Sequence, residues 1–153
     1  MVCAAKILAM LLAGAIDILT AWRGVWTCTS TASNFIAPVH LSMQATTYGK
    51  WVQFNGNEPA HDGSPARAFV MLVTYNRHER KWFIDSYGES GGVILSTSSA
   101  APDATRQTWV NIYPVNSNQS LGTIVATANT WDTYDSWRDN GKRLSSHVSC
   151  KKT

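Results

Sequence analysis

The side chains that proteins most often use for catalysis are scattered along this sequence. Its four histidines are His40, His61, His78 and His147, and none stands at the spacing of an HExxH or HxxxH metal motif. There is no Gly-x-Ser-x-Gly elbow and no glycine-rich phosphate loop. The three cysteines form no Cys-x-x-Cys pair and no Cys/His spacing typical of zinc. These patterns predict no metal, no cofactor and no nucleophilic triad.

Acidic residues offer one candidate for a functional carboxyl group. Asp132 and Asp135 are three residues apart, so on a strand they would face opposite sides and not act as a pair. Asp85 falls on the strand face that also carries Phe83 and Tyr87. An acid in such surroundings has a raised pKa if it is buried. The alternative is an aspartate that satisfies backbone groups of a hairpin.

Aromatic side chains alternate with polar ones on several strands, as in a lined cavity. The face shared by Gln107, Trp109, Asn111 and Tyr113 shows this pattern most clearly. Seven Trp exceed what the floor of a compact barrel needs. We therefore predict an interior that binds a small, largely apolar ligand. The candidate cavity residues are Trp82, Asp85, Tyr87, Gln107, Trp109, Asn111, Tyr113 and Trp131. Two alternatives are a solvent face that carries Trp and a solid barrel whose Trp side chains pack on each other.

The elements that would position these residues are short strands. From Gly24 onward the sequence is rich in Val, Ile, Thr, Trp and Tyr, with turn residues about every 8–12 positions, which is typical of all-β domains. We expect strands at 24–30, 36–43, 50–54, 68–75, 82–87, 93–97, 108–113, 122–128 and 130–137, with a turn at Asn140-Gly141 leading into 142–149. Closure would hide the edges of so many strands. The prediction is a single antiparallel up-and-down barrel of about 8–10 strands, with a two-sheet sandwich as the alternative.

The N-terminus has the features of an export signal. Lys6 precedes an uncharged apolar run at 7–16, which is too short to span a bilayer but fits the core of a signal peptide. Ala13-Gly14-Ala15 supplies the small residues that a signal peptidase needs. We predict a signal peptide at 1–15, a barrel domain at 16–153, a secreted or periplasmic location and no integral membrane span. The alternative is an amphipathic helix that caps the fold.

Cysteine count agrees with export. Cleavage would remove Cys3 and leave Cys28 and Cys150 as an even pair near the two ends of the mature chain. In an up-and-down barrel the first and last strands pair, so a bridge between these two cysteines is within reach. The alternative is two buried free thiols in a cytosolic protein.

Composition excludes other classes of protein. The 153 residues suffice for one domain, and 44% of them are hydrophobic against 15% charged, so the chain is too apolar to be disordered. Its net charge of +3 comes without a long basic tract, which disfavours nucleic acid as a partner.

The first expected strand carries a family resemblance. Gly24-Val25-Trp26 resembles the Gly-x-Trp motif of lipocalin and calycin barrels, and scattered positions over 22–152 resemble a group of small lipocalin-like secreted proteins. The resemblance implies that Trp26 closes the barrel beneath a basic side chain, Arg138 or else Arg143. A similarity to nitrobindin-type barrels would make His147 a haem ligand, but its polar neighbours argue against that role.

Three functions follow in order of support. The first is a secreted barrel, monomeric or dimeric, that binds a small apolar or amphipathic molecule in its interior. The second is an enzyme of the cyclase or isomerase type that acts through pocket shape and one or two polar groups. The third is an extracellular protein-interaction domain. Where the Trp side chains point discriminates among them.

Overall fold

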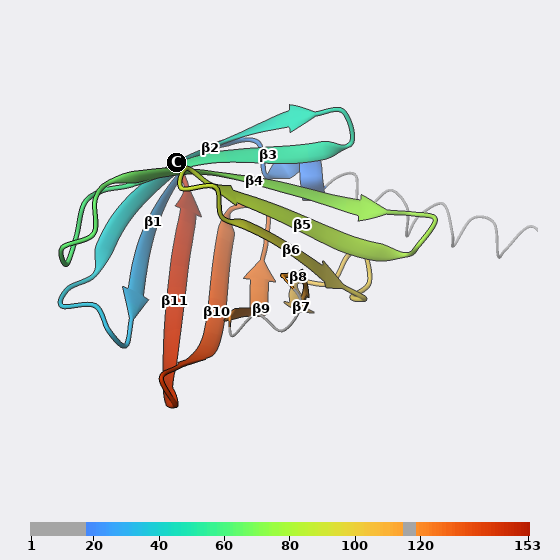
Figure 1. Cartoon of the computed structure of the whole chain (residues 1–153). Coiled ribbons are helices and arrows are strands. Elements are labelled where there is room, and N and C mark those ends of the chain that lie inside the picture. The colour runs from blue at the N-terminus through green and yellow to red at the C-terminus, as the bar shows by residue number, and fades with distance from the viewer. Residues whose placement is uncertain (1–17, 115–118) are drawn as a thin grey trace, which may run out of the picture.

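A single antiparallel sheet forms almost the whole molecule (Figure 1). The computed structural model describes residues 18–114 and 119–153, so the predicted signal segment lies outside the described residues. The eleven strands are β1 (Gly24–Ala32), β2 (Val39–Tyr48), β3 (Trp51–Glu58), β4 (Arg67–Asn76), β5 (Lys81–Gly88), β6 (Val93–Ser98), β7 (Arg106–Thr108), β8 (Val110–Tyr113), β9 (Gln119–Ala126), β10 (Thr130–Asp139) and β11 (Lys142–Lys152). Helix is limited to one short turn at 18–21 in the part described.

The sheet curls into a nearly closed barrel. Its strand order is β7-β9-β10-β11-β1-β2-β3-β4-β5-β6-β8, so the first and last strands pair as expected. The segment around Trp109 joins the two ends of the sheet, because β7 before it pairs with β9 and β8 after it pairs with β6. The Trp109 backbone N–H also donates to the carbonyl oxygen of Gly122 at 3.1 Å. The predicted up-and-down barrel is therefore confirmed.

The strand count differs from the predicted eight to ten for a local reason. One expected strand at 108–113 is split at Trp109, where the chain changes partner from β9 to β6. The last segment extends to Lys152 as a full strand, because β1 and β10 flank it on both sides.

Aromatic rings fill the core. Trp22 contacts Trp131 with ring centroids 4.8 Å apart and Trp82 at 6.0 Å, and Phe54 lies 5.5 Å from Trp131. These rings are buried, and each lies on an inward-facing strand position or on the turn before β1. Such offset and edge-to-face pairs stabilise a core beyond their buried area.

The Cys28–Cys150 disulfide joins the first and last strands. The two residues are direct cross-strand partners in the β1–β11 register, and both are buried. The predicted bridge is present, and it fastens the pairing that closes the barrel.

Candidate functional site

Half of the predicted cavity residues face the interior and are fully buried. These are Trp82, Gln107, Trp109 and Trp131. Asn111 is half-buried, and its side-chain oxygen accepts a hydrogen bond of 2.8 Å from the hydroxyl of the buried Ser96. The structure therefore turns the face shared by Gln107, Trp109 and Asn111 toward the interior.

The inward Trp side chains are packed core. The indole N–H of Trp82 donates to the carbonyl oxygen of Ala101 at 3.3 Å, and that of Trp131 donates to Thr133 Oγ1 at 2.9 Å. Trp109 differs, because its buried Nε1 meets no acceptor among the described residues. Trp82 and Trp131 thus contact other rings at the positions where a ligand wall was expected.

Asp85, Tyr87 and Tyr113 do not line the interior. On β5 the buried side chains are Trp82 and Ile84, so the alternate residues Asp85 and Tyr87 lie on the outer face. Tyr113 is 52% exposed at the end of β8. The sequence pattern identified the shared face of Asp85 and Tyr87 but assigned it to the wrong side, because both faces of this strand are largely apolar.

The predicted cation over Trp26 is a second correction. Arg138 and Arg143 are cross-strand partners at the β10–β11 turn, whereas Trp26 pairs with Lys152 at the other end of β11. Lys152 passes close to Gly24, where a Cβ atom would lie 2.9 Å from its Cε, and its Nζ donates to the carbonyl oxygen of Ala21 at 2.7 Å. The absence of a side chain at Gly24 leaves room for this lysine.

A cleft of about 740 Å³ opens at the Trp26 end of the barrel. It lies between the short turn at 18–21, the β2–β3 turn and the β4–β5 turn. Leu19, Val52 and Tyr75 give it apolar walls, and Tyr75 packs edge-on against Trp82 at 5.3 Å. Its volume falls within the usual range of small-molecule sites.

Local hydrogen bonds fix the two turns beside the cleft. Thr74 Oγ1 donates to the carbonyl oxygen of Lys50 at 2.8 Å, which ties β4 to the β2–β3 turn. The side-chain oxygen of Asn76 accepts from the backbone N–H groups of His78 and Glu79 at 2.9 and 3.2 Å. Asparagine stabilises turns in this way. The turn that carries Arg77 and His78 is therefore held by contacts within the turn, whereas the position of Lys50 is held by a hydrogen bond to a different hairpin.

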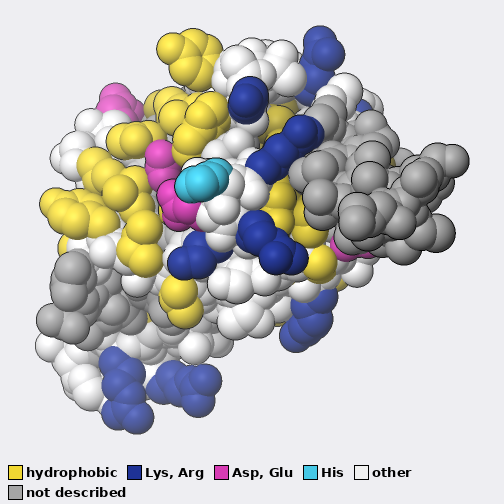
Figure 2. All heavy atoms as spheres, turned by 90° about the vertical axis from the view of Figure 1, so that its right-hand side faces the viewer, with side chains coloured by type: hydrophobic (Ala, Val, Ile, Leu, Met, Phe, Trp, Pro, Cys, Tyr) yellow, Lys and Arg dark blue, Asp and Glu magenta, His cyan; other side chains and the backbone are white. Residues whose placement is uncertain are grey.

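The rim of the cleft is cationic. Lys50, Arg77 and His78 line it, and no acidic residue is among its lining residues in the described part of the chain. Figure 2 shows Lys and Arg side chains around the middle of the face that carries these turns. No binding role was predicted for Arg77 and His78 from the sequence. The missed signal was that two hairpin turns with cations stand at the same end of an up-and-down barrel.

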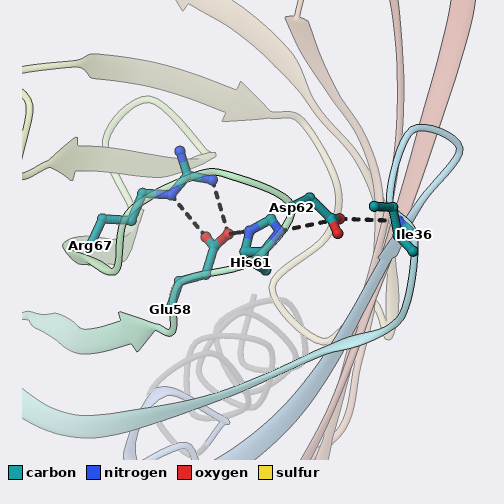
Figure 3. Close-up of polar contacts among 5 residues, drawn as sticks. All are labelled: Ile36, Glu58, His61, Asp62 and Arg67. Atoms are coloured by element: carbon teal, nitrogen blue, oxygen red, sulfur yellow. Dashed lines mark hydrogen bonds and ion pairs between the residues drawn. The ribbon is translucent and has the colours of Figure 1, made fainter.

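The opposite end of the barrel is crossed by the β3–β4 connection (Figure 3). Arg67 donates to both carboxylate oxygens of Glu58 at 3.0 and 3.1 Å, and Nε2 of His61 contacts the same carboxylate. Nδ1 of His61 lies 3.5 Å from Asp62, which accepts a hydrogen bond of 3.1 Å from the backbone N–H of Ile36. The cluster holds this connection to the β1–β2 loop.

The pKa of Glu58 reflects two opposed effects. Burial is the largest and acts to raise the pKa, but the hydrogen bonds from Arg67 and His61 together outweigh it and leave the pKa below its ordinary value. The carboxylate is thus ionised and occupied by its partners, which suits a structural clip.

Asp135 is a partly buried acid that the sequence analysis considered only as a possible partner of Asp132. It lies opposite the irregularity between β9 and β10, and its Oδ1 accepts a hydrogen bond of 2.6 Å from the backbone N–H of Gly122. Burial raises its pKa to about 6, although that hydrogen bond acts to lower it. The carboxyl group satisfies a backbone donor that the irregular pairing leaves out of the ladder.

His147 lies on the outer face and contacts other side chains of this chain. Its Nε2 is 3.0 Å from Asp132 Oδ1, and its ring stacks on Tyr134 with centroids 4.4 Å apart. No group of three His, Cys, Asp or Glu side chains within 18–114 and 119–153 is arranged to hold a metal ion.

Comparisons with known proteins support the fold alone. No family model matches this chain, and a comparison with curated proteins gives no match. Among solved structures, a redesigned β-barrel is similar, with a TM-score of 0.52, 9% sequence identity and coverage of 89% of this chain and 95% of that chain. No helix in the described residues is long and apolar enough to cross a membrane.

Proposed function

We propose that this protein is an exported barrel that binds a small amphipathic anion in the cleft at its Trp26 end. The observation that carries the proposal is the pairing of apolar walls with a cationic rim in one cleft of about 740 Å³. The binding function is the one predicted from the sequence, but its place moves from the aromatic interior to the end of the barrel.

The chemistry of the lining defines the ligand. An apolar chain or ring would cover the half-buried side chains of Leu19 and Tyr75 and so remove apolar surface from water. A carboxylate, sulfate or phosphate head group would lie near Lys50 and Arg77, where exposed cations attract an anion without the cost of deep burial. The aromatic core beneath the cleft supplies a rigid floor.

Export is supported by two features. The Cys28–Cys150 bridge is of the kind that persists in oxidising compartments, and the apolar run at 7–16 fits a signal peptide.

The first prediction concerns charge at the rim. Arg77→Glu should weaken binding of decanoate at least tenfold, because it replaces an attractive charge by a repulsive one, and it should leave binding of 1-decanol unchanged. Trp51, which also lines the cleft, gives a fluorescence readout, and titration calorimetry gives the affinities. Arg138→Glu is the matched control, because Arg138 is an exposed cation at the other end of the barrel.

Two further measurements decide the place of binding. Thr47→Trp fills the cleft with a bulky side chain at an exposed position and should abolish binding of both ligands. If no member of a panel of fatty acids, aryl sulfates and haem binds below about 100 μM, or if Thr47→Trp binds normally, the proposal is wrong.

A further inference from the structure

The outer face of β4, β5, β6 and β8 carries an apolar patch. It consists of Val70, Leu72, Phe83, Tyr87, Val93, Leu95, Val110, Ile112 and Tyr113, which are exposed or half-buried. On β4, β5 and β6 these positions alternate with the core, and on β8 the irregular pairing with β6 leaves both Ile112 and Tyr113 exposed. Figure 2 shows hydrophobic side chains gathered at the left of the face that carries the β4–β5 turn. By contrast, the outward positions of β2 carry His40, Ser42, Gln44 and Thr46.

One carboxyl group lies in the middle of this patch. Asp85 pairs with Leu72 on one side and Leu95 on the other, and Phe83 and Tyr87 precede and follow it on the same face of β5. No described residue gives Asp85 a hydrogen bond or an ion pair, and partial burial raises its pKa. A carboxylate among apolar neighbours is destabilised until a cation meets it.

The lone carboxyl group discriminates among the surfaces that could cover the patch. An anionic lipid surface would place phosphate groups near Asp85, which is unfavourable. A second copy of this chain would place two Asp85 carboxyl groups in one interface. The patch covers four strands about 4.8 Å apart and about five residues along each, roughly 300 Å², which suits a small, transient contact, because a stable interface buries ~800 Å² per partner.

A cationic side chain from another protein would complement both the carboxyl group and the apolar residues of the patch. Its charge would pair with Asp85, its aliphatic stem would lie along Leu72 and Leu95, and Phe83 and Tyr87 would offer aromatic faces to the cation. Interfaces concentrate their binding energy in such small, desolvated centres.

We propose that the outer face of β4, β5, β6 and β8 is a docking surface for a protein partner that inserts a lysine or arginine, flanked by apolar residues, against Asp85. This surface is separate from the cleft at the Trp26 end, so the partner and the small ligand are bound independently.

A site-specific photo-cross-link identifies the segment that covers the patch. The full chain carrying Ile112→p-benzoylphenylalanine is irradiated in extract and medium of its natural source, and the linked peptide is sequenced by mass spectrometry. Ile36→p-benzoylphenylalanine is the control, because Ile36 is 88% exposed away from the patch. The expected product joins position 112 to a segment of another protein in which Lys or Arg stands among apolar residues.

A synthetic copy of that segment then tests the role of Asp85. Replacing its cation by norleucine should weaken binding to the unsubstituted protein at least tenfold and should change binding to Asp85→Asn less than twofold. Arg77→Glu should bind the segment normally, which keeps this test distinct from that of the cleft.

Several results would overturn the proposal. One is that position 112 yields no more product than position 36. Another is a linked segment that lacks a cation or belongs to this same chain. A third is that norleucine weakens binding to Asp85→Asn as much as binding to the unsubstituted protein. Sedimentation with vesicles of phosphatidylcholine and phosphatidylglycerol that Leu95→Ser abolishes would assign the patch to a lipid surface instead.

Discussion

Asp85 and Asp135 differ in role because their carboxyl groups have different surroundings. Asp85 has no partner and lies among apolar side chains on the outer face. Asp135 has a raised pKa as well, but its carboxyl group accepts the backbone N–H of Gly122. A raised pKa alone therefore does not separate a binding residue from a structural one, whereas the presence or absence of a partner does.

Asp135 makes the stability of the barrel depend on pH. Its folded-state pKa of about 6 lies above the ordinary value near 3.8, because burial disfavours the charged form. Between these two values the folded state binds a proton that the unfolded state has lost. This group therefore lowers the free energy of unfolding as pH rises from about 4 to 6, and its effect is constant above that range.

Asp135→Asn should remove this dependence. The amide oxygen can still accept the Gly122 N–H, and no charge is buried, so we expect the variant to be about 1–2 kcal/mol more stable at pH 7 and equal to the unsubstituted protein near pH 4. Urea unfolding at several pH values measures the difference. Asp103→Asn, at an exposed loop position, should change nothing. A variant that is less stable at pH 7 would contradict the assignment.

At the scale of elements, the β3–β4 pair shows how neighbouring strands share space. Gly56 of β3 is buried and is the direct cross-strand partner of Phe69 of β4. The Phe69 ring covers the position that a Cβ atom at residue 56 would occupy. An aromatic ring that covers a glycine in this way compensates for the missing side chain.

Gly56→Ala should destabilise the barrel by roughly 1–3 kcal/mol, because the added methyl group displaces the Phe69 ring from a packed position. In a Phe69→Ala background the same change should cost much less, and the two changes should couple by about 1 kcal/mol or more. Denaturant unfolding of the four proteins in this cycle measures the coupling. Additive effects would mean that the ring and the glycine do not share the space.

At the scale of the whole molecule, the disulfide limits the number of conformations that the unfolded chain can adopt. It joins residues 122 positions apart across the β1–β11 pair. A cross-link of this span removes much of the entropy of the unfolded chain, worth about 5 kcal/mol in the chain-entropy model. That is comparable with the total stability of many domains.

The variant Cys28→Ala/Cys150→Ala should lose about 4–5 kcal/mol of unfolding free energy, which guanidinium unfolding followed by circular dichroism measures. Dithiothreitol should reproduce the loss in the unsubstituted protein and have no further effect on the variant. An unchanged midpoint after reduction would show that strand pairing alone holds the barrel closed.

The sequence by itself determined the fold class, because turn residues and strand alternation are patterns of neighbouring residues. Turn residues and two-residue alternation placed nearly every strand, and the Cys28–Cys150 bridge was anticipated from cysteine count together with the pairing of first and last strands. Gln107 and Trp109 were assigned to one face, and the structure places both in the interior.

Two features were decided only by the tertiary structure. The first is which face of a strand points inward when both faces are apolar, as for Asp85 on β5. The second is which ends of distant strands meet. The cleft depends on the second point, because Leu19, Lys50 and Arg77 come together only when the barrel closes. The same holds for Lys152, which reaches the Trp26 end because β11 runs antiparallel to β1. Alternation shows which residues of a strand share a face, but it does not show which of the two faces points inward. The inward face is set by what the neighbouring strands pack against.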